Sequence, residues 1–126
     1  MSQPTVVILG ASTDRSKFGN KSVRAHLQAG YTVYPVNPKA AEVEGLAAYA
    51  SIADLPIETV DRVSIYLPPA VGMTMLDKIL SLHPQEVWLN PGSESPELLA
   101  HAQALGLPVV QGCSIVDLGM SPSQFP

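Results

Sequence analysis

The sequence contains one cysteine and few charged side chains. Of its 126 residues only Cys113 carries a thiol, so no disulfide can form within the chain, and this cysteine usage favours a reducing compartment. Lys and Arg together number 7 against 11 Asp and Glu, and the net charge of −4 argues against a broad nucleic-acid-binding face, which needs excess positive charge. This balance still allows one local basic pocket for an anionic ligand.

Long apolar runs and metal-ligand sets are also missing. No apolar stretch reaches the roughly 20 residues that span a bilayer, so we expect no membrane partner. The first residues show no basic region followed by a long apolar one, so we expect no signal peptide and a cytoplasmic protein. One cysteine and three scattered histidines do not form the usual ligand sets, so we expect no metal site. The length suits a single domain, residues 1–126, and the 46% hydrophobic content is typical of a folded core.

Strand-like and helix-like segments alternate along the chain. Short apolar runs rich in β-branched residues predict strands, and apolar residues at helical spacing predict helices. The predicted strands are residues 6–9, 31–38, 60–69, 86–92 and 109–111, and the predicted helices are residues 21–29, 70–82 and 95–106. The weaker pattern between them indicates a short strand or turn followed by a small helical turn at 51–55, and residues 120–126 are predicted to be a loose tail.

This alternation predicts an α/β fold built from repeated βαβ units, with an open, mainly parallel sheet and helices on both faces. In such sheets, ligands bind outside the carboxyl ends of the strands, near the point where the strand order reverses. The loops that follow the predicted strands are rich in Gly, Pro, Ser and Asn. That composition suits close approach of a ligand to the backbone better than acid–base chemistry.

The first of these loops, GASTDRSKFG, has features of an anion site. Gly10 permits a tight turn, and Ala11 and Ser12 are small enough to let a phosphate approach the backbone. Gly19 opens the following helix, whose free N–H groups and dipole favour an anion, and Lys17 can add positive charge. The loop matches neither the G-x-G-x-x-G fingerprint nor the Walker A pattern, so an ordinary strand-to-helix turn remains the alternative.

The second loop bears on which nucleotide could bind. Folds that bind NAD usually end the second strand with Asp or Glu, which accepts hydrogen bonds from the ribose hydroxyls. Here the strand ends with Asn37, Pro38 and Lys39. A cation in place of a carboxylate is unsuited to NAD but suits a ligand with a phosphate on its adenosine ribose, as in NADP and coenzyme A. A surface lysine at a turn is the alternative for Lys39.

Taken in order, several segments resemble the small stand-alone CoA-binding proteins, which are similar to the CoA-binding domain of the succinyl-CoA synthetase α subunit. The segments are VVILGAS with the later GN, GYTVYPVNPK, AYASIADLP, VDRVSIYLPP, VWLNPGSES and GLPVVQGC. The resemblance extends from Thr5 to about Val116. It implies a Rossmann-like three-layer fold with CoA held across the strand ends.

The resemblance also implies which residues contact the ligand. In loop order, they are Gly10, Ala11 and Ser12 with Lys17 near the CoA phosphates, Asn37, Pro38 and Lys39 beside the adenosine end, Pro68 and Pro69 in a third contact loop, and Asn90, Pro91 and Gly92 in a fourth. Asn90 stands where many relatives carry Gln.

The sequence gives little sign of catalytic groups. In the synthetase, the phosphorylated histidine lies in a second domain, whereas His26, His83 and His101 fall within or at the end of predicted helices, away from the ligand loops. No two carboxylates in those loops form an acid–base pair. Cys113 follows the last strand, where it could exchange with the CoA thiol or be a small buried apolar side chain.

We therefore predict a module that binds CoA or an acyl-CoA at the carboxyl ends of the strands, without catalysis of its own. The alternatives are an NADP-binding oxidoreductase, a subunit of a split acyl-CoA ligase, and a regulatory subunit with a vestigial pocket. The expected partner is a CoA-type small molecule, and a homodimer or a separate catalytic subunit is left open.

Overall fold

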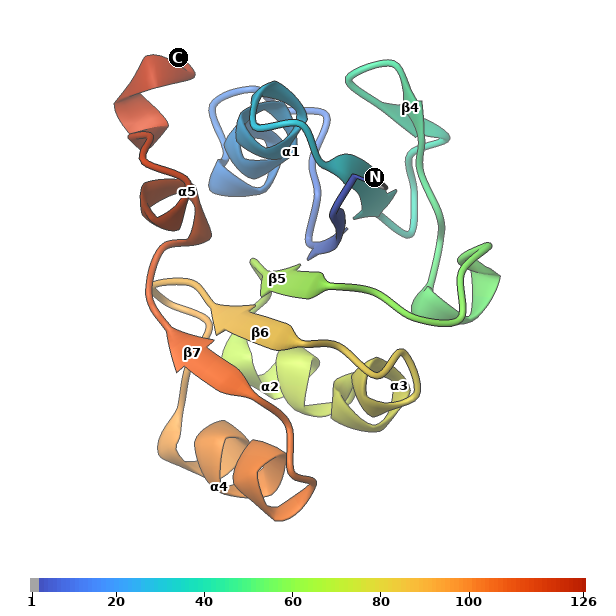
Figure 1. The fold of residues 1–126 in the computed structure, drawn as a ribbon, viewed down its shortest axis with the longest axis vertical. Helices are drawn as coiled ribbons and strands as arrows, with labels where there is room; N and C mark the ends of the chain where they lie inside the picture. The colour runs from blue at the N-terminus through green and yellow to red at the C-terminus, as the bar shows by residue number, and fades with distance from the viewer. Residues whose placement is uncertain (1–2) are drawn as a thin grey trace.

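The computed structural model describes residues 3–126 (Figure 1). In this part of the chain a five-stranded sheet has the order β2-β1-β5-β6-β7, with every neighbouring pair parallel. Its strands are β1 (Thr5–Leu9), β2 (Thr32–Val36), β5 (Arg62–Ile65), β6 (Glu86–Leu89) and β7 (Val109–Gln111). The chain builds outward from β1 to β2 and then returns to place β5 on the other side of β1. The strand order therefore reverses between β1 and β5.

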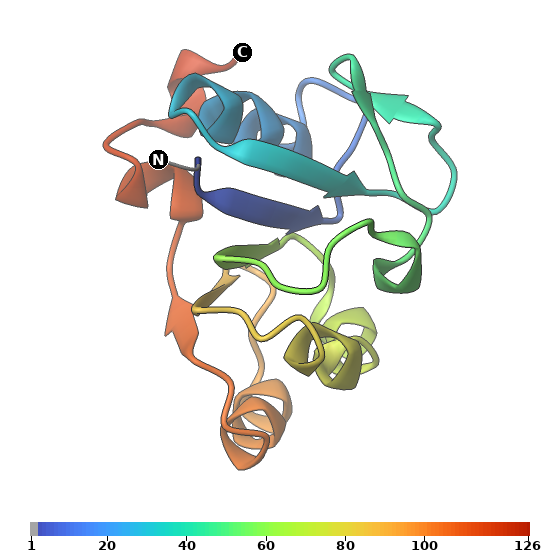
Figure 2. The same ribbon diagram turned by 45° about the vertical axis from the view of Figure 1, so that its right-hand side comes forward.

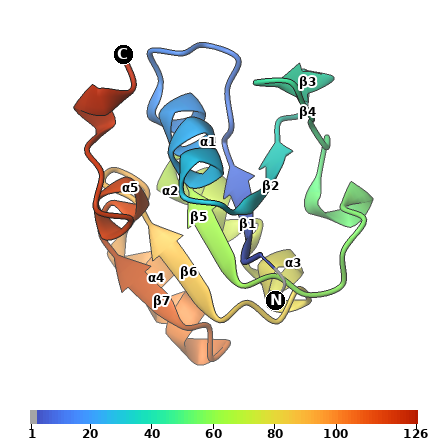
Figure 3. The same ribbon diagram turned by 45° about the horizontal axis from the view of Figure 1, so that its top comes forward.

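Helices cover both faces of this sheet. They are α1 (Phe18–Gln28), α2 (Pro69–Met73), α3 (Leu76–Leu80), α4 (Pro96–Ala104) and α5 (Ser114–Asp117), with short 3-10 helices η1 (Ile52–Asp54) and η2 (Pro122–Gln124). Figure 1 shows α1 and α5 on one face and α2, α3 and α4 on the other, and the turned views of Figures 2 and 3 show the same separation. The predicted α/β, Rossmann-like fold is confirmed.

The central strand β1 shows why the sheet is buried on both sides. Val7 and Leu9 belong to the core beneath α2, α3 and α4, whereas Val6 and Ile8 pack in a second core beneath α1, which includes Val23. Successive side chains of a strand point to opposite faces, so a continuous apolar run fits a strand with a core on each side. All four of these β1 side chains are at most 1% exposed.

The weak middle segment forms a small antiparallel hairpin of β3 (Glu42–Val43) and β4 (Leu46–Ala47). Glu44 and Gly45 connect the two strands, and both have positive φ angles, 50° and 78°. Two consecutive left-handed residues are the pattern of the tight hairpin turn that follows the twist of its strands. The expected short strand or turn, and the helical turn that follows it, are both confirmed.

The predicted helix at 70–82 is wrong in one respect, because it is divided into α2 and α3 by Thr74 and Met75. Ile79 and Leu82 are buried as the helical spacing predicts, but Val71 is 41% exposed. The absence of a side chain at Gly72 lets α2 approach α4 closely, since a Cβ atom there would lie 3.1 Å from the Leu98 side chain. The α4 helix begins one residue after the start of the predicted range 95–106, and Ser95 is its N-cap, with Ser95 Oγ accepting from the Leu98 N–H at 3.1 Å.

The C-terminal segment is not the loose tail that the sequence predicts. Residues 120–126 contain η2, which a reciprocal capping box between Ser121 and Gln124 stabilises. Phe125 is 7% exposed and packs in a third core with Ala25 of α1 and Ile115 of α5. Arg24 donates to the carbonyls of Phe125 at 3.1 Å and Pro126 at 3.2 Å. The composition of residues 120–126 does not predict this ordered structure, because it depends on contacts with residues about 100 positions earlier in the sequence.

At the amino ends of the strands, the buried guanidinium of Arg62 holds β5, β6, α1 and α5 together. It pairs with Glu86 at 2.8 Å and with Asp117, and it lies 3.4 Å from His26 Nε2. His26 Nδ1 lies 2.8 Å from the Ser22 carbonyl, so the neutral ring with its proton on Nδ1 satisfies both neighbours. Burial lowers the pKa of His26 to about 4, which keeps the ring neutral at pH 7.

Within residues 3–126, no helix combines the length and the apolar character that crossing a bilayer requires. In the same residues, no three His, Cys, Asp or Glu side chains gather where they could hold a metal ion.

Candidate functional site

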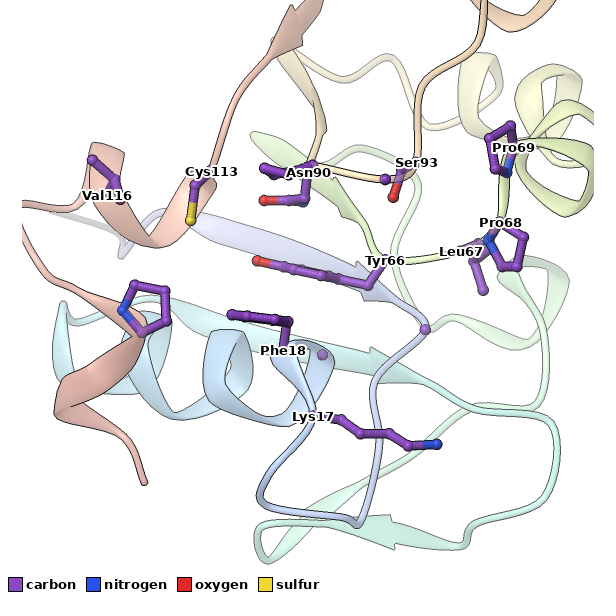
Figure 4. A pocket seen from close by; sticks show the side chains of 15 residues that line it. Lys17, Phe18, Tyr66, Leu67, Pro68, Pro69, Asn90, Ser93, Cys113 and Val116 are labelled. Carbon is purple, nitrogen blue, oxygen red and sulfur yellow. The ribbon is translucent and has the colours of Figure 1, made fainter.

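A pocket of about 640 Å³ lies at the carboxyl ends of the parallel strands (Figure 4). Its walls come from the segments that follow β1, β5, β6 and β7, together with the start of α1. The lining residues are Gly10, Lys17, Phe18, Gly19, Tyr66, Leu67, Pro68, Pro69, Asn90, Pro91, Gly92, Ser93, Cys113, Val116 and Pro122. The pocket thus begins where the strand order reverses and extends toward β7, which is the place that open parallel sheets offer to ligands.

The structure brings most of the predicted site residues to this pocket. Those that line it are Gly10, Lys17, Gly19, Pro68, Pro69, Asn90, Pro91 and Gly92. The others, Ala11, Ser12, Asn37, Pro38 and Lys39, lie in the adjoining loops after β1 and β2 and are not part of the lining. Most of the predicted site residues therefore meet at this pocket. Their contact with a ligand stays a prediction.

Gly10 and Gly19 allow two backbones to meet at the start of α1. A Cβ atom on Gly19 would lie 2.1 Å from the Gly10 carbonyl oxygen, and a Cβ atom on Gly10 would lie 2.5 Å from the Tyr66 carbonyl oxygen. Gly10 also has a φ of 87°, which side chains disfavour. The two glycines therefore let the ends of β1 and β5 and the start of α1 pack in direct contact, which fixes where the helix points.

The N-terminus of α1 lies against the pocket. Lys17 is the N-cap residue, and its side chain makes no capping hydrogen bond. Within residues 3–126, no acidic residue occupies the first turn of this helix. The first N–H groups of an uncapped helix and its dipole favour an anion, and the ammonium group of Lys17 adds a formal positive charge. This end of the pocket is therefore electropositive.

The loop between β1 and α1 is shaped by its own short side chains. Ser12 Oγ accepts from the Asp14 N–H at 3.0 Å, and Asp14 Oδ1 accepts from the Ser16 N–H at 3.0 Å and the Ser16 hydroxyl at 2.6 Å. The hydrogen bond from the Ser16 side chain holds the pKa of Asp14 below its usual value. Ser12 therefore acts first as a turn-forming residue, and its hydroxyl is already engaged with the backbone.

Asn37 fixes the loop after β2 to the loop after β1. Its amide nitrogen donates to the Ala11 carbonyl at 2.8 Å, and its oxygen accepts from the N–H groups of Lys39 at 2.8 Å and Ala40 at 2.9 Å. The Asn37 side chain is therefore a brace, and the interpretation of this residue as a direct ligand contact gains no support from its geometry. Lys39 remains exposed at the edge of the brace.

Asn90 is a second brace, at the end of β6. Its side-chain nitrogen donates to Ser64 Oγ at 2.8 Å and to the Ile65 carbonyl at 2.9 Å, and its oxygen accepts from the Ser114 N–H at 2.9 Å. Asn90 lines the pocket, but only 1% of its surface is exposed, so little of it is accessible to a ligand. The next residues form a tight turn closed by the Ser93 N–H donating to the Asn90 carbonyl at 2.9 Å. Gly92 has a φ of 94°, as the third position of a type II turn requires.

Sequence reasoning missed the apolar part of the lining. Phe18 and Val116 are exposed by 57% and 59%, and both border the pocket with Pro122. The Tyr66 ring faces the same space in Figure 4, and its hydroxyl lies 3.1 Å from Ser114 Oγ. Burial raises the pKa of the Tyr66 hydroxyl. The sequence places Phe18 just before the predicted helix at 21–29, but the exposure of Phe18 and the places of Val116 and Pro122 depend on the packing.

Cys113 is half-buried in the lining, and Figure 4 shows its sulfur directed toward the pocket. The histidines lie elsewhere. His26 is buried in α1, His101 lies in α4 and His83 follows α3. Lys17, Tyr66 and Cys113 are the titratable side chains of the lining.

Comparisons with known proteins agree with this geometry. A family model described as a CoA binding domain matches residues 4–119. Over 63 residues, the chain is 38% identical to acetate–CoA ligase [ADP-forming] I of Archaeoglobus fulgidus, a match covering 50% of this chain and only 9% of the ligase. The structure of cell-free ID.343 from Thermus thermophilus is 35% identical with a TM-score of 0.82, covering 91% of this chain and 87% of that one.

A longer protein carries the same fold. The dinucleotide-forming acetyl-coenzyme A synthetase 1 of Ca. Korarchaeum cryptofilum, solved with phosphate and ADP, is 29% identical with a TM-score of 0.71. The likeness covers 84% of this chain and 25% of that chain. The fold thus occurs both in a chain of similar size and as one part of a much longer synthetase chain.

Proposed function

The chain belongs to the CoA-binding domain family, and we propose that it binds coenzyme A or an acyl-CoA at the carboxyl ends of its parallel strands. The observation that carries this proposal is the pocket of about 640 Å³ at those ends, in the volume range of small-molecule sites. One end of the pocket is electropositive and the other is apolar. A ligand with phosphates at one end and an extended uncharged arm matches that polarity.

The topology supports one direction for the ligand. In sheets of this kind, the adenosine half of a dinucleotide lies on the β2 side of the reversal point, and its phosphates lie at the start of the first helix. In this chain, Lys39 lies on the β2 side and Lys17 at the start of α1. The pocket itself extends the other way, over β5, β6 and β7. We therefore place the pantetheine arm in the pocket and the ribose phosphate near Lys39.

The end of β2 also favours CoA over NAD. Asn37, Pro38 and Lys39 offer a cation where an NAD site has a carboxylate for the ribose hydroxyls. NADP has a ribose phosphate as well, so it is the relevant competitor. We propose that this chain binds the ligand, and we propose no catalytic step for it.

Titration calorimetry with CoA, dephospho-CoA, NADP and NAD tests the proposal. Dephospho-CoA lacks a charge-assisted contact worth about 1.5–3 kcal/mol, so it should bind roughly tenfold or more weakly than CoA. Lys39→Ala should reduce the affinity for CoA by a similar factor and leave that for dephospho-CoA unchanged. Lys78→Ala, on the exposed side of α3, is the matched control. A response to NADP without one to CoA would refute the proposal.

A second candidate function is the CoA-binding component of a split acyl-CoA ligase. The observation that favours it is the match to part of an ADP-forming acetate–CoA ligase and to a quarter of an acetyl-CoA synthetase chain. This function predicts that the chain copurifies with an ATP-binding partner from its own cells and that the pair forms an acyl-CoA from acid, ATP and CoA. Purification of the chain alone, with no ATP-dependent acyl transfer after adding the lysate back, would count against it.

A further inference from the structure

The end of the pocket beside β7 has an apolar wall made of Phe18, Tyr66, Cys113, Val116 and Pro122. Figure 4 shows labelled members of this wall gathered on the side away from Pro68 and Pro69. Two of the wall residues are large apolar side chains with more than half of their surface exposed. Exposed apolar side chains that converge on a pocket indicate a surface that a ligand covers.

The polar groups behind this wall are already engaged. Tyr66 Oη lies 3.1 Å from Ser114 Oγ, which in turn lies 2.7 Å from Ser64 Oγ. The Ser114 N–H donates to Asn90 Oδ1 at 2.9 Å. Among the residues that the structure describes, no buried side-chain nitrogen or oxygen is left without a partner. The wall therefore offers a ligand apolar contact and few new side-chain hydrogen bonds.

One cation lies beside the wall but outside the pocket lining, since Lys21 Nζ is 5.7 Å from the centroid of the Phe18 ring. Lys17 is the cationic side chain of the lining, and Figure 4 shows it extending away from Phe18 and Val116. The nearest charged groups behind the wall are committed elsewhere: Asp117 of α5 pairs with Arg62, and Arg24 of α1 donates to Asn20 and to the carbonyls of Arg15, Phe125 and Pro126. A carboxylate placed against Val116, on the side of the pocket away from Lys17 (Figure 4), would lose water without gaining a cation from the lining.

We propose that this wall holds a short uncharged acyl group, so that the chain binds acetyl-CoA and butyryl-CoA more tightly than free CoA and discriminates against succinyl-CoA. This inference rests on the proposed function, because it places the thioester end of the ligand at the wall. Each methylene that the wall removes from water adds to affinity. Butyryl and succinyl groups are nearly equal in length, and they differ in having a terminal methyl or a terminal carboxylate.

The experiment is calorimetric titration of the intact chain with CoA, acetyl-CoA, butyryl-CoA and succinyl-CoA. Butyryl-CoA should bind about fivefold or more tightly than CoA, with acetyl-CoA between them. Succinyl-CoA should bind about tenfold or more weakly than butyryl-CoA. Equal affinities for butyryl-CoA and succinyl-CoA, or an affinity for CoA equal to that for butyryl-CoA, would overturn the inference and leave the proposed function standing. Failure of all four to bind a folded chain would remove both.

Variants at the wall sharpen the test. Val116→Lys adds a cation to an exposed position, so it should weaken butyryl-CoA binding and strengthen succinyl-CoA binding, reversing their order. Leu80→Lys, on the exposed face of α3, is the matched control and should leave all four affinities as they are. If Val116→Lys shifts butyryl-CoA and succinyl-CoA by the same factor, the acyl group does not reach the wall.

Discussion

The contact between Gly19 and Gly10 offers a sharp test of how the site is built. A methyl group added by Gly19→Ala would lie 2.1 Å from the Gly10 carbonyl oxygen. Real Cβ atoms essentially never come within 3.0 Å of another heavy atom, so the two backbones must separate by at least about 0.9 Å, the difference between 3.0 and 2.1 Å. Both partners are backbone, so no side chain can rotate to relieve the contact.

The expected cost follows from two opposing effects. Overpacking of this kind destabilises by about 1–3 kcal/mol, while alanine in place of a helical glycine stabilises by about 1 kcal/mol. We expect Gly19→Ala to lower the free energy of unfolding by up to about 2 kcal/mol in urea titrations. Because the start of α1 moves away from the β1 loop, the affinity for CoA should fall roughly tenfold or more, as a misplacement near 1 Å does at other positioned sites.

Gly72→Ala is the matched control. Gly72 is also helical, but its added methyl would lie 3.1 Å from the end of the Leu98 side chain, which can move. This variant should change the free energy of unfolding by less than about 1 kcal/mol and leave CoA binding intact. If Gly19→Ala matches Gly72→Ala in both stability and CoA affinity, the glycine contact does not set the position of α1 and the reasoning is refuted.

Two further predictions concern α1 away from the pocket. Burial lowers the pKa of His26 from 6.5 to about 4. Between those pH values the His26 ring is therefore protonated in the unfolded chain and neutral in the folded chain. Stability should therefore decrease as the pH falls from 6.5 toward 4, by about 3 kcal/mol in total from this group, and urea titrations of His26→Gln should show that much less pH dependence. Arg24→Ala removes the donor to the carbonyls of Phe125 and Pro126. It should lower the free energy of unfolding by about 2 kcal/mol and speed proteolysis of residues 120–126, whereas Lys78→Ala should do neither.

Much of the fold could be read from the sequence, because its central strands are apolar and a glycine follows each of the two longest helices, α1 and α4. The run around Val6 predicts a strand buried on both faces, and Gly30 and Gly106 end α1 and α4 with the expected positive φ angles of 91° and 75°. The division of residues 70–82 escaped prediction, because apolar spacing continues through the break. The order of residues 120–126 escaped it as well, since Phe125 is buried only by contacts with distant elements.

Residue types at the site were easier to predict than their roles. The resemblance to CoA-binding proteins predicts Asn37 and Asn90 as ligand contacts in strand-end loops, and Asn90 does border the pocket. Their side chains, however, hold the protein's own backbone, through partners as distant in sequence as Ala11 and Ser114. A local pattern can indicate that a polar residue lies at a strand end. Which hydrogen bonds it makes depends on the strand order, which local patterns do not specify.

The two asparagine braces bear on which groups are left to recognise a ligand in the pocket and in the adjoining loop. Each brace directs its amide to protein groups and so takes a polar side chain out of ligand recognition. The groups left to a ligand include the uncapped start of α1 with Lys17, and the wall that includes Phe18 and Val116. Recognition must then come from charge at the first end and from apolar area at the second. The consequence is that substitutions of the braces should reduce stability and affinity together, whereas substitutions at Lys17 or Val116 should change affinity alone.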